Sequence, residues 1–217
     1  MALFYQDIFL SINGESKSTG LPTTFVRLWG CPVKCSYCDQ PQPRSERKKI
    51  SVERIVETVR KLRCPRVCIT GGEPLIYDET IIVVYDLVGM GFEVSIETSG
   101  CVPIEPCHYQ RSFRYVMDIK CPSSGVSHEN IFKNLSILHE KDEVKVVINN
   151  REDYDYFLDV WKKHPTRASI LLSPVTKKSL RYGYRPAVGK DLVDWVLQDK
   201  CWNVRVGYQL HKVMGVV

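Results

Sequence analysis

The chain has 217 residues, 44% of them hydrophobic, which is enough to bury one good core, so we expect a single domain over residues 1–217. The formal net charge of +5 is mild and the basic residues are spread out, which fits a solvated surface better than a contact with RNA or another anion. No apolar run approaches the about 20 residues of a membrane span, and residues 1–10 lack the basic start of a signal peptide. We expect neither a membrane nor a direct nucleic-acid partner.

Strand and helix patterns alternate along the chain. Residues 7–12 alternate weakly and lead into a turn at residues 13–16. Strand patterns follow at 24–28, 66–70, 92–97, 115–119, 143–148, 169–172 and 203–206. Helical spacing predicts helices at 51–62, where Ser51 can be the N-cap, and at 78–88, 129–140, 154–161 and 191–197. Residues 41–49, rich in proline and charge, read as a connection.

This repeated βα order predicts an α/β fold with a parallel sheet, either a barrel or an open doubly wound sheet. Polar motifs follow most of the strands. Because the carboxyl ends of parallel strands share one face, these motifs should meet there. Six or seven units, rather than eight, favour a partial, open-sided (βα)6-like barrel. The motifs are residues 31–38, 71–74, 98–100, Lys120, Asn149 and Ser173.

Cys31, Cys35 and Cys38 form a C-x3-C-x2-C group just after the first parallel strand. Three thiolates can hold three irons of a 4Fe–4S cluster and leave the fourth iron open, whereas a closed site takes four ligands. Zinc is an alternative if Cys64 and Cys68 supply a second ligand pair, and plain core cysteines are another. Nine cysteines crowded in this way argue against a disulfide framework and suggest a reducing, cytoplasmic location.

Two further features could face a ligand. Arg27 stands between apolar residues of a strand and is either on the exposed face or directed inward toward an anion, which its planar fork suits. Gly71 and Gly72 let the backbone approach a ligand closely, and Glu73 could fix the charge of an amino group. An ordinary glycine turn is the simpler interpretation of that segment.

The cysteine loop together with the Gly-Gly-Glu-Pro segment resembles the radical SAM enzymes. In that family the amino and carboxylate groups of S-adenosylmethionine (SAM) bind the open iron, and the cofactors supply a 5′-deoxyadenosyl radical. The resemblance implies a 4Fe–4S cluster, SAM and a reductant such as flavodoxin or ferredoxin.

The chain as a whole is similar to the 7-carboxy-7-deazaguanine synthase family of queuosine and deazapurine biosynthesis. Members are carbon–nitrogen lyases that contract the ring of 6-carboxy-5,6,7,8-tetrahydropterin with loss of ammonia, using SAM and Mg2+. A homodimer is expected from the same resemblance. The segments that carry it are residues 11–15, 25–32, 69–74, 96–100 and 209–212.

By that resemblance two groups of residues surround the site. The substrate group is Ile12, Asn13, Gly14, Glu15, Arg27, Thr70, His211 and Val217. The cofactor group is Tyr37, Cys38, Asp39, Gly72, Glu73, Ser99, Asp118, Ile119, Lys120, Ser173, Pro174, Val175 and Thr176. His211 could equally be a structural partner. No side chain is assigned as a catalytic acid or base, because the radical belongs to the cofactors.

The chain departs from the family pattern at Gln40, where a hydroxyl side chain that reaches Mg2+ is usual. A glutamine carbonyl is also a hard oxygen ligand, so Gln40 is the expected Mg2+ ligand. Mg2+ beside the substrate carboxylate would act as a Lewis acid.

Some alternatives stay open. The chain could be another radical SAM enzyme, such as a glycyl-radical activase, or a non-enzymatic iron–sulfur or zinc protein. Cys101, Cys107 and Cys121 could hold a second cluster, although Cys64, Cys68, Cys107 and Cys201 fit core or surface positions as well.

Overall fold

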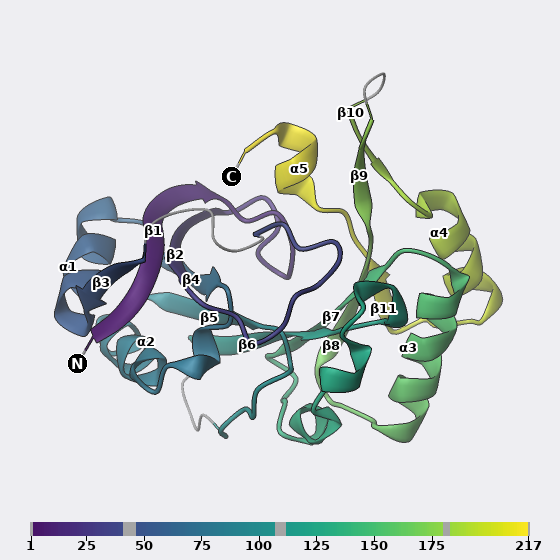
Figure 1. Ribbon diagram of the computed structural model, residues 1–217, viewed down its shortest axis with the longest axis horizontal. Coiled ribbons are helices and arrows are strands. Elements are labelled where there is room, and N and C mark those ends of the chain that lie inside the picture. Colours follow the sequence, from purple (N-terminus) through teal and green to yellow (C-terminus); the bar gives the residue numbers. More distant parts are fainter. Residues whose placement is uncertain (1, 41–46, 107–111, 180–182, 217) are drawn as a thin grey trace.

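A nine-stranded sheet organises the chain (Figure 1). The computed structural model describes residues 2–40, 47–106, 112–179 and 183–216. Within them, the sheet has the order β11-β8-β7-β6-β5-β4-β2-β1-β3. The strands are β1 (Ala2–Ile12), β2 (Pro22–Leu28), β3 (Lys48–Ser51), β4 (Arg66–Gly71), β5 (Glu93–Thr98), β6 (Phe113–Ile119), β7 (Glu143–Ile148), β8 (Ser169–Pro174) and β11 (Val204–Val206), and a separate hairpin pairs β9 (Thr176–Ser179) with β10 (Gly183–Pro186).

Seven neighbouring strands of the sheet run parallel to one another, as the βα alternation predicts: β2, β4, β5, β6, β7, β8 and β11. The sheet does not close, because β11 and β3 lie at opposite edges of it. The prediction of an open, partial barrel is therefore confirmed. The connection predicted at 41–49 is wrong at its end, since Lys48 and Lys49 belong to β3, which pairs antiparallel with β1. Pairing of this kind satisfies backbone groups that the edge strand β1 would otherwise leave open.

Four helices pack on the outer face of the sheet and complete the core: α1 (Val52–Leu62), α2 (Glu79–Gly89), α3 (Arg151–Lys163) and α4 (Gly189–Gln198). The short helix α5 (Leu210–Met214) lies outside this core. Ile55 of α1, Leu87 of α2 and Phe157 of α3 are fully buried in the same core as the strand residues Ile69 and Ile96. Ser51 caps α1 by accepting from Arg54 N at 3.2 Å, as predicted. None of the helices in the described ranges has the length and apolarity needed to cross a bilayer.

The inner face of the sheet is polar, unlike the outer one. Successive side chains of a strand point to opposite faces, so positions two apart share a face. The neighbouring strands β2, β4, β5, β6 and β7 follow this rule. In each of them one set of alternate residues is apolar and lies in the core, while the other set lines a cavity. The cavity-lining sets are Phe25 and Arg27, Thr70 and Gly72, Glu97 and Ser99, Val116, Asp118 and Lys120, and Lys145, Val147 and Asn149.

The helix predicted at 129–140 is wrong. The segment forms 3-10 turns instead, η3 (Ser127–Glu129) and η4 (Phe132–Ser136). Two asparagine side chains bond the loops beside it: Asn130 accepts from Lys120 N at 2.9 Å, and Asn134 donates to Gly100 O and Val102 O. Asparagine competes with a helical backbone in this way, and tertiary contacts here favour the irregular path.

Candidate active site

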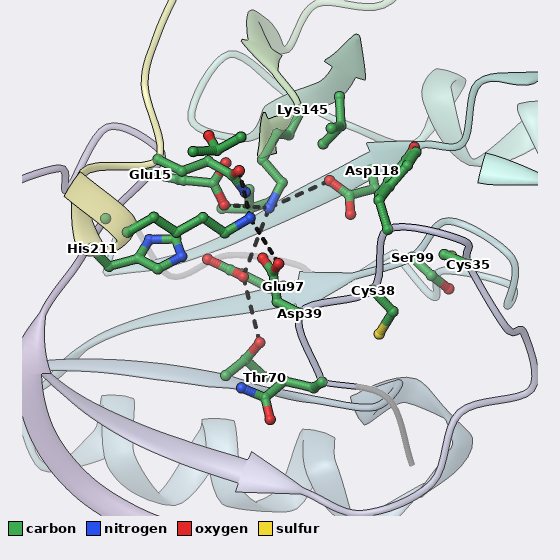
Figure 2. A pocket seen from close by; sticks show the side chains of 18 of the residues that line it. Glu15, Cys35, Cys38, Asp39, Thr70, Glu97, Ser99, Asp118, Lys145 and His211 are labelled. Carbon is green, nitrogen blue, oxygen red and sulfur yellow. Dashed lines mark hydrogen bonds and ion pairs between the residues drawn. The ribbon is translucent and has the colours of Figure 1, made fainter. Parts of the chain in front are cut away.

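The inner face of the sheet and the loops at the carboxyl ends of its strands enclose a cavity of about 960 Å³. Segments far apart in sequence meet there. The turn after β1, the cysteine loop after β2, the ends of β4 to β7 and α5 all contribute lining residues (Figure 2). The cavity therefore joins the motifs that the sequence distributes along the chain.

The cysteine loop is anchored on both sides. Ser36 donates from its backbone N to Ser124 O at 2.9 Å and from its hydroxyl to Ser123 O at 2.6 Å. On the other side Glu73 N donates to Gly30 O at 2.7 Å. These bonds hold the loop between the segments that follow β4 and β6.

Cys31, Cys35 and Cys38 line the cavity on this anchored loop; Cys35 is partly exposed, and Cys31 and Cys38 are exposed. Burial raises the pKa of the Cys35 thiol, and the nearby Lys120 ammonium opposes that rise. In the described part of the chain, no three His, Cys, Asp or Glu side chains converge on a point that could hold one metal ion. The three thiols, one short loop and a nearby cation fit a polynuclear cluster with one open iron.

The other cysteines do not join this loop. Cys64 donates to Pro22 O, and Cys68 is fully buried within β4, so both lie at or toward the amino end of that strand, away from the cysteine loop. The alternative zinc site that used them is wrong for this geometry. Cys121 is fully buried and donates to Asp153 O, and Cys101 donates to Ser99 O. Cys107 lies outside the described residues, so a second cluster stays a prediction.

The Gly71–Gly72 segment is required by close packing. A Cβ at Gly72 would lie 1.8 Å from Gly30 O and would clash with the backbone that leads into the cysteine loop. Gly71 has φ +125°, which favours glycine, and a Cβ there would lie 2.2 Å from Leu28 O. The glycines thus bring the end of β4 into contact with the cysteine loop, and Gly72 lines the cavity.

Glu73 does not face the cavity, contrary to expectation. It is fully buried, and one carboxylate oxygen accepts from Thr98 Oγ1, Ser99 N and Ser99 Oγ at 3.0, 2.6 and 2.6 Å. The other oxygen accepts from Leu75 N at 2.9 Å. Its hydrogen bonds are therefore made within the protein, and they position Ser99 at the cavity wall.

A group of buried charges occupies the middle of the inner face (Figure 2). Lys145 Nζ lies 3.1 Å from Glu15 Oε2, 3.5 Å from Asp118 Oδ1 and 3.9 Å from Glu97 Oε2. Lys120 Nζ lies 2.6 Å from Asp118 Oδ2. Burial would raise the pKa of Asp118, but Lys120 and Lys145 outweigh it and lower that pKa. The structure thus places two ammonium groups among three carboxylates.

The chain's last described segment closes one side of the cavity. Leu210 N donates to Gly14 O at 2.9 Å, and the His211 ring occupies the space where a Cβ of Gly14 would lie. Lys212 Nζ lies 2.7 Å from Asp39 Oδ1, beside the cysteine loop. Burial lowers the pKa of His211, which favours its neutral ring.

Most residues expected at the site line the cavity. Those that do not are Glu73, Ile119, Ser173 and Pro174, and Val217 lies outside the described residues. Sequence reasoning missed Glu97, Lys145 and Lys212, and it noted Asn149 without assigning it a ligand. For Glu97 and Lys145 the signal was a set of polar side chains at alternate places of a largely apolar strand: Glu93, Ser95 and Glu97 in β5, and Glu143 and Lys145 in β7. The residues found at the cavity are Ile12, Asn13, Gly14, Glu15, Arg27, Cys31, Cys35, Tyr37, Cys38, Asp39, Gln40, Thr70, Gly72, Ser99, Asp118, Lys120, Val175, Thr176 and His211.

Comparison with known proteins identifies the family. The family model described as the radical SAM superfamily matches residues 29–163. The 7-carboxy-7-deazaguanine synthase of Koribacter versatilis is 36% identical over 95% of this chain and 94% of its own length. That of Methanospirillum hungatei is 38% identical over 97% and 84%. The chain belongs to the 7-carboxy-7-deazaguanine synthase family of the radical SAM superfamily.

Solved structures agree on the fold. The crystal structure of QueE from Escherichia coli has a TM-score of 0.73 at 21% identity and covers 97% of this chain and 95% of that one. Streptococcus suis SuiB bound to S-adenosylmethionine has a TM-score of 0.58 at 13% identity, over 82% and 48%. The predicted fold class, superfamily and synthase family are therefore confirmed. This radical SAM family member is an enzyme, as predicted.

Proposed function

We propose that the protein converts 6-carboxy-5,6,7,8-tetrahydropterin to 7-carboxy-7-deazaguanine, with ring contraction and release of ammonia. The observation that carries this proposal is that most residues of the expected substrate group and cofactor group line one cavity. The chain also aligns with named synthases over nearly its full length. The cluster and SAM would supply the radical that removes a substrate hydrogen. The chain's own residues hold and orient the reactants.

The substrate half of the cavity contains the guanidinium of Arg27 and several hydrogen-bond acceptors. Arg27 extends from β2 beside Thr70 of β4, and its guanidinium lies 4.9 Å from the centre of the Phe9 ring. A planar guanidinium is suited to a substrate carboxylate. Glu15 and the backbone of residues 12–14 face the same space and can accept from the amino and ring N–H groups of the pterin.

The cofactor half contains polar groups whose hydrogen bonding is incomplete. In the described chain, Asn149 Oδ1, Thr176 Oγ1 and the Tyr37 hydroxyl are buried without a hydrogen-bond partner. Each belongs to a residue that lines the cavity near the cysteine loop or the ends of β7 and β8. A buried polar group without a partner costs free energy, so these groups favour a polar ligand such as SAM.

Mg2+ is part of the proposal, with Gln40 as its protein ligand. Gln40 lines the cavity two residues after Cys38, and its amide oxygen is a hard donor that Mg2+ accepts. Asp39, the neighbouring carboxylate, is held by Lys212. An ion held by Gln40 and the substrate carboxylate would stabilise negative charge on the substrate.

We also propose the cellular setting of the enzyme. It would act in the cytoplasm as a homodimer of single-domain subunits over residues 1–217, and a reduced flavodoxin or ferredoxin would supply the electron. The unpaired thiols among the described cysteines, including all three of the cysteine loop, suit a reducing compartment.

The test is anaerobic reconstitution with iron and sulfide, followed by SAM, Mg2+, reductant and carboxytetrahydropterin. Ultraviolet spectra and mass spectrometry should show 7-carboxy-7-deazaguanine, one ammonia for each product, and SAM that persists over many turnovers. A loaded protein that cleaves SAM but leaves the pterin unchanged would refute the proposed reaction and favour another radical SAM activity.

Arg27→Ala should raise the KM for carboxytetrahydropterin by roughly 10- to 100-fold, since a charge-assisted bond is worth about 1.5–3 kcal/mol. SAM affinity should stay near that of the wild type, because Arg27 lies on the substrate side of the cavity. Steady-state kinetics and SAM titration measure the two effects. Arg60→Ala, an exposed arginine on α1, is the matched control and should change neither value. Unchanged pterin KM in Arg27→Ala would remove Arg27 from the substrate contacts.

A further inference from the structure

Lys145 stands at the centre of the charged group on the inner face, yet nothing in the proposed reaction gives it a direct partner in the substrate. Its side chain is 9% exposed, and its ammonium lies within 4 Å of carboxylates from three separate elements. Glu15 comes from the turn after β1, Glu97 from β5 and Asp118 from β6. Lys145 therefore links the turn after β1 to β5 and β6, and in the described chain no other ion pair joins these three segments.

The charges around Lys145 do not cancel. Glu15, Glu97 and Asp118 contribute three negative charges, and Lys145 and Lys120 contribute two positive ones. Isolated carboxylates in such a place would take up protons, because burial disfavours the charged form. Lys120 is occupied by Asp118 at 2.6 Å, so Lys145 is the cation near Glu15 and Glu97.

This arrangement of charges shifts the pKa values of Lys145 and Glu97. Burial lowers the pKa of Lys145, but Asp118, Glu15 and Glu97 outweigh it and raise that pKa well above its ordinary value. Burial raises the pKa of Glu97, and Lys145 is the main group that opposes the rise. The surrounding elements carry further titratable and charged groups: Lys120, the buried thiol of Cys68 on β4, His211 and Lys212 on α5, and an ion pair of Arg114 on β6 with Glu143 on β7.

Two carboxylate oxygens of this group, Glu15 Oε1 and Asp118 Oδ1, are buried without a hydrogen-bond partner in the described structure. Glu15 Oε2 is bonded to Lys145 Nζ, whereas Glu15 Oε1 is buried and has no hydrogen-bond partner in the described structure. Glu15 is 8% exposed and lines the cavity. Glu97 reaches the same space, with Thr70 Oγ1 as a weak donor at 3.4 Å. Two carboxylate acceptors in a cavity that Phe25 also lines suit a flat ligand edge rich in N–H groups.

We propose that Lys145 is a positioning residue that holds the carboxylates of Glu15 and Glu97 in place on the cavity wall, so that the cavity selects a 2-amino-4-oxopyrimidine edge over a 2,4-dioxo edge. This inference rests on the proposed function and adds the origin of its substrate selectivity. A carboxylate only accepts hydrogen bonds, whereas a protonated carboxyl also donates and can pair with an oxo group. Without the ammonium, Glu97 should protonate more readily, Glu15 should lose the donor that holds it, and selectivity should fall.

The experiment compares Lys145→Met with the wild type in the loaded enzyme, using carboxytetrahydropterin and its 2,4-dioxo counterpart over a range of pH. For the amino substrate, kcat/KM should fall roughly 10- to 100-fold near neutral pH. Its rise with pH should move to higher pH, because removal of Lys145 takes away the cation that opposes the raised pKa of Glu97. The preference for the amino substrate should shrink as well.

Three further variants complete the design. Lys145→Arg keeps the charge and should restore the wild-type pH profile. Glu97→Gln should lower selectivity in the presence of Lys145, which keeps the inference testable if Lys145→Met folds poorly. Lys133→Met, an exposed lysine of η4 outside the cavity, is the control for loss of charge.

The outcomes separate the two proposals. Wild-type enzyme that does not convert the pterin would overturn the proposed function. Wild-type conversion with an unchanged pH profile and unchanged selectivity in both Lys145→Met and Glu97→Gln would overturn the role of Lys145 alone. Circular dichroism, cluster absorbance and SAM titration should match between wild type and Lys145→Met.

Discussion

Cys35→Ala should yield a folded protein that cannot hold a redox-active cluster and whose reductive cleavage of SAM falls to the level of the iron-free protein. Cys35 is the middle thiol of the loop, and it lies where Lys120 is close enough to act on its charge. With two thiolates remaining, the cluster would lose one of its three protein-bound irons. Iron and sulfide analysis, visible absorbance and detection of 5′-deoxyadenosine measure the result.

Cys101→Ala is the matched control. Cys101 is partly exposed and donates to Ser99 O at 3.7 Å, but it does not line the cavity. Its removal should leave iron content and SAM cleavage unchanged. If Cys35→Ala still cleaves SAM, or if Cys101→Ala loses iron to the same extent, the assignment of the cluster to residues 31–38 is wrong.

Gly72→Ala should disturb the cysteine loop and weaken SAM binding while most of the fold remains. The added Cβ would lie 1.8 Å from Gly30 O and 2.4 Å from Gly30 C, both backbone atoms that cannot turn aside. Such overpacking costs about 1–3 kcal/mol of unfolding free energy. Since each kcal/mol shifts Tm by about 2–4 °C in a chain of this size, a fall of several degrees is expected. Thermal denaturation and SAM titration measure both effects.

Gly89→Ala separates the contact from a general effect of losing a glycine. Gly89 ends α2, and a Cβ there would meet no atom within 4 Å. Alanine in a helix is favoured over glycine by roughly 0.5–1 kcal/mol, so this variant should be neutral or slightly more stable. Equal loss of SAM binding in both variants would show that the Gly72–Gly30 contact is not what positions the loop.

Local signals predicted most elements well. The strand at 143–148 is β7 in full, and Ser51 caps α1 with its side chain. The helix predicted at 129–140 failed because Asn130 and Asn134 make their bonds to loops that come before them in sequence. A pattern of apolar residues at helical spacing contains no information about such distant partners.

The candidate site was predicted unevenly for a similar reason. Motifs that follow a strand, such as the cysteine loop, can be recognised in the sequence from their residue types and spacing. Lys145 and Glu97 are charged residues within largely apolar strands, so their role depends on which face of the sheet they share and on which residues lie opposite them. The contact of Lys145 with Glu15 spans 130 residues of sequence, and only the folded sheet brings the two together.

By itself, the sequence determined the βα alternation, the three-thiol loop and the family, because each of these depends on residue types at short, fixed spacings. Only the tertiary structure decided that Glu73 is used within the protein, that α5 closes one side of the cavity and that the inner face carries a buried group of unequal charges. Those facts depend on long-range packing and on the exclusion of water, which make a carboxylate or an ammonium costly to bury and so require a partner nearby.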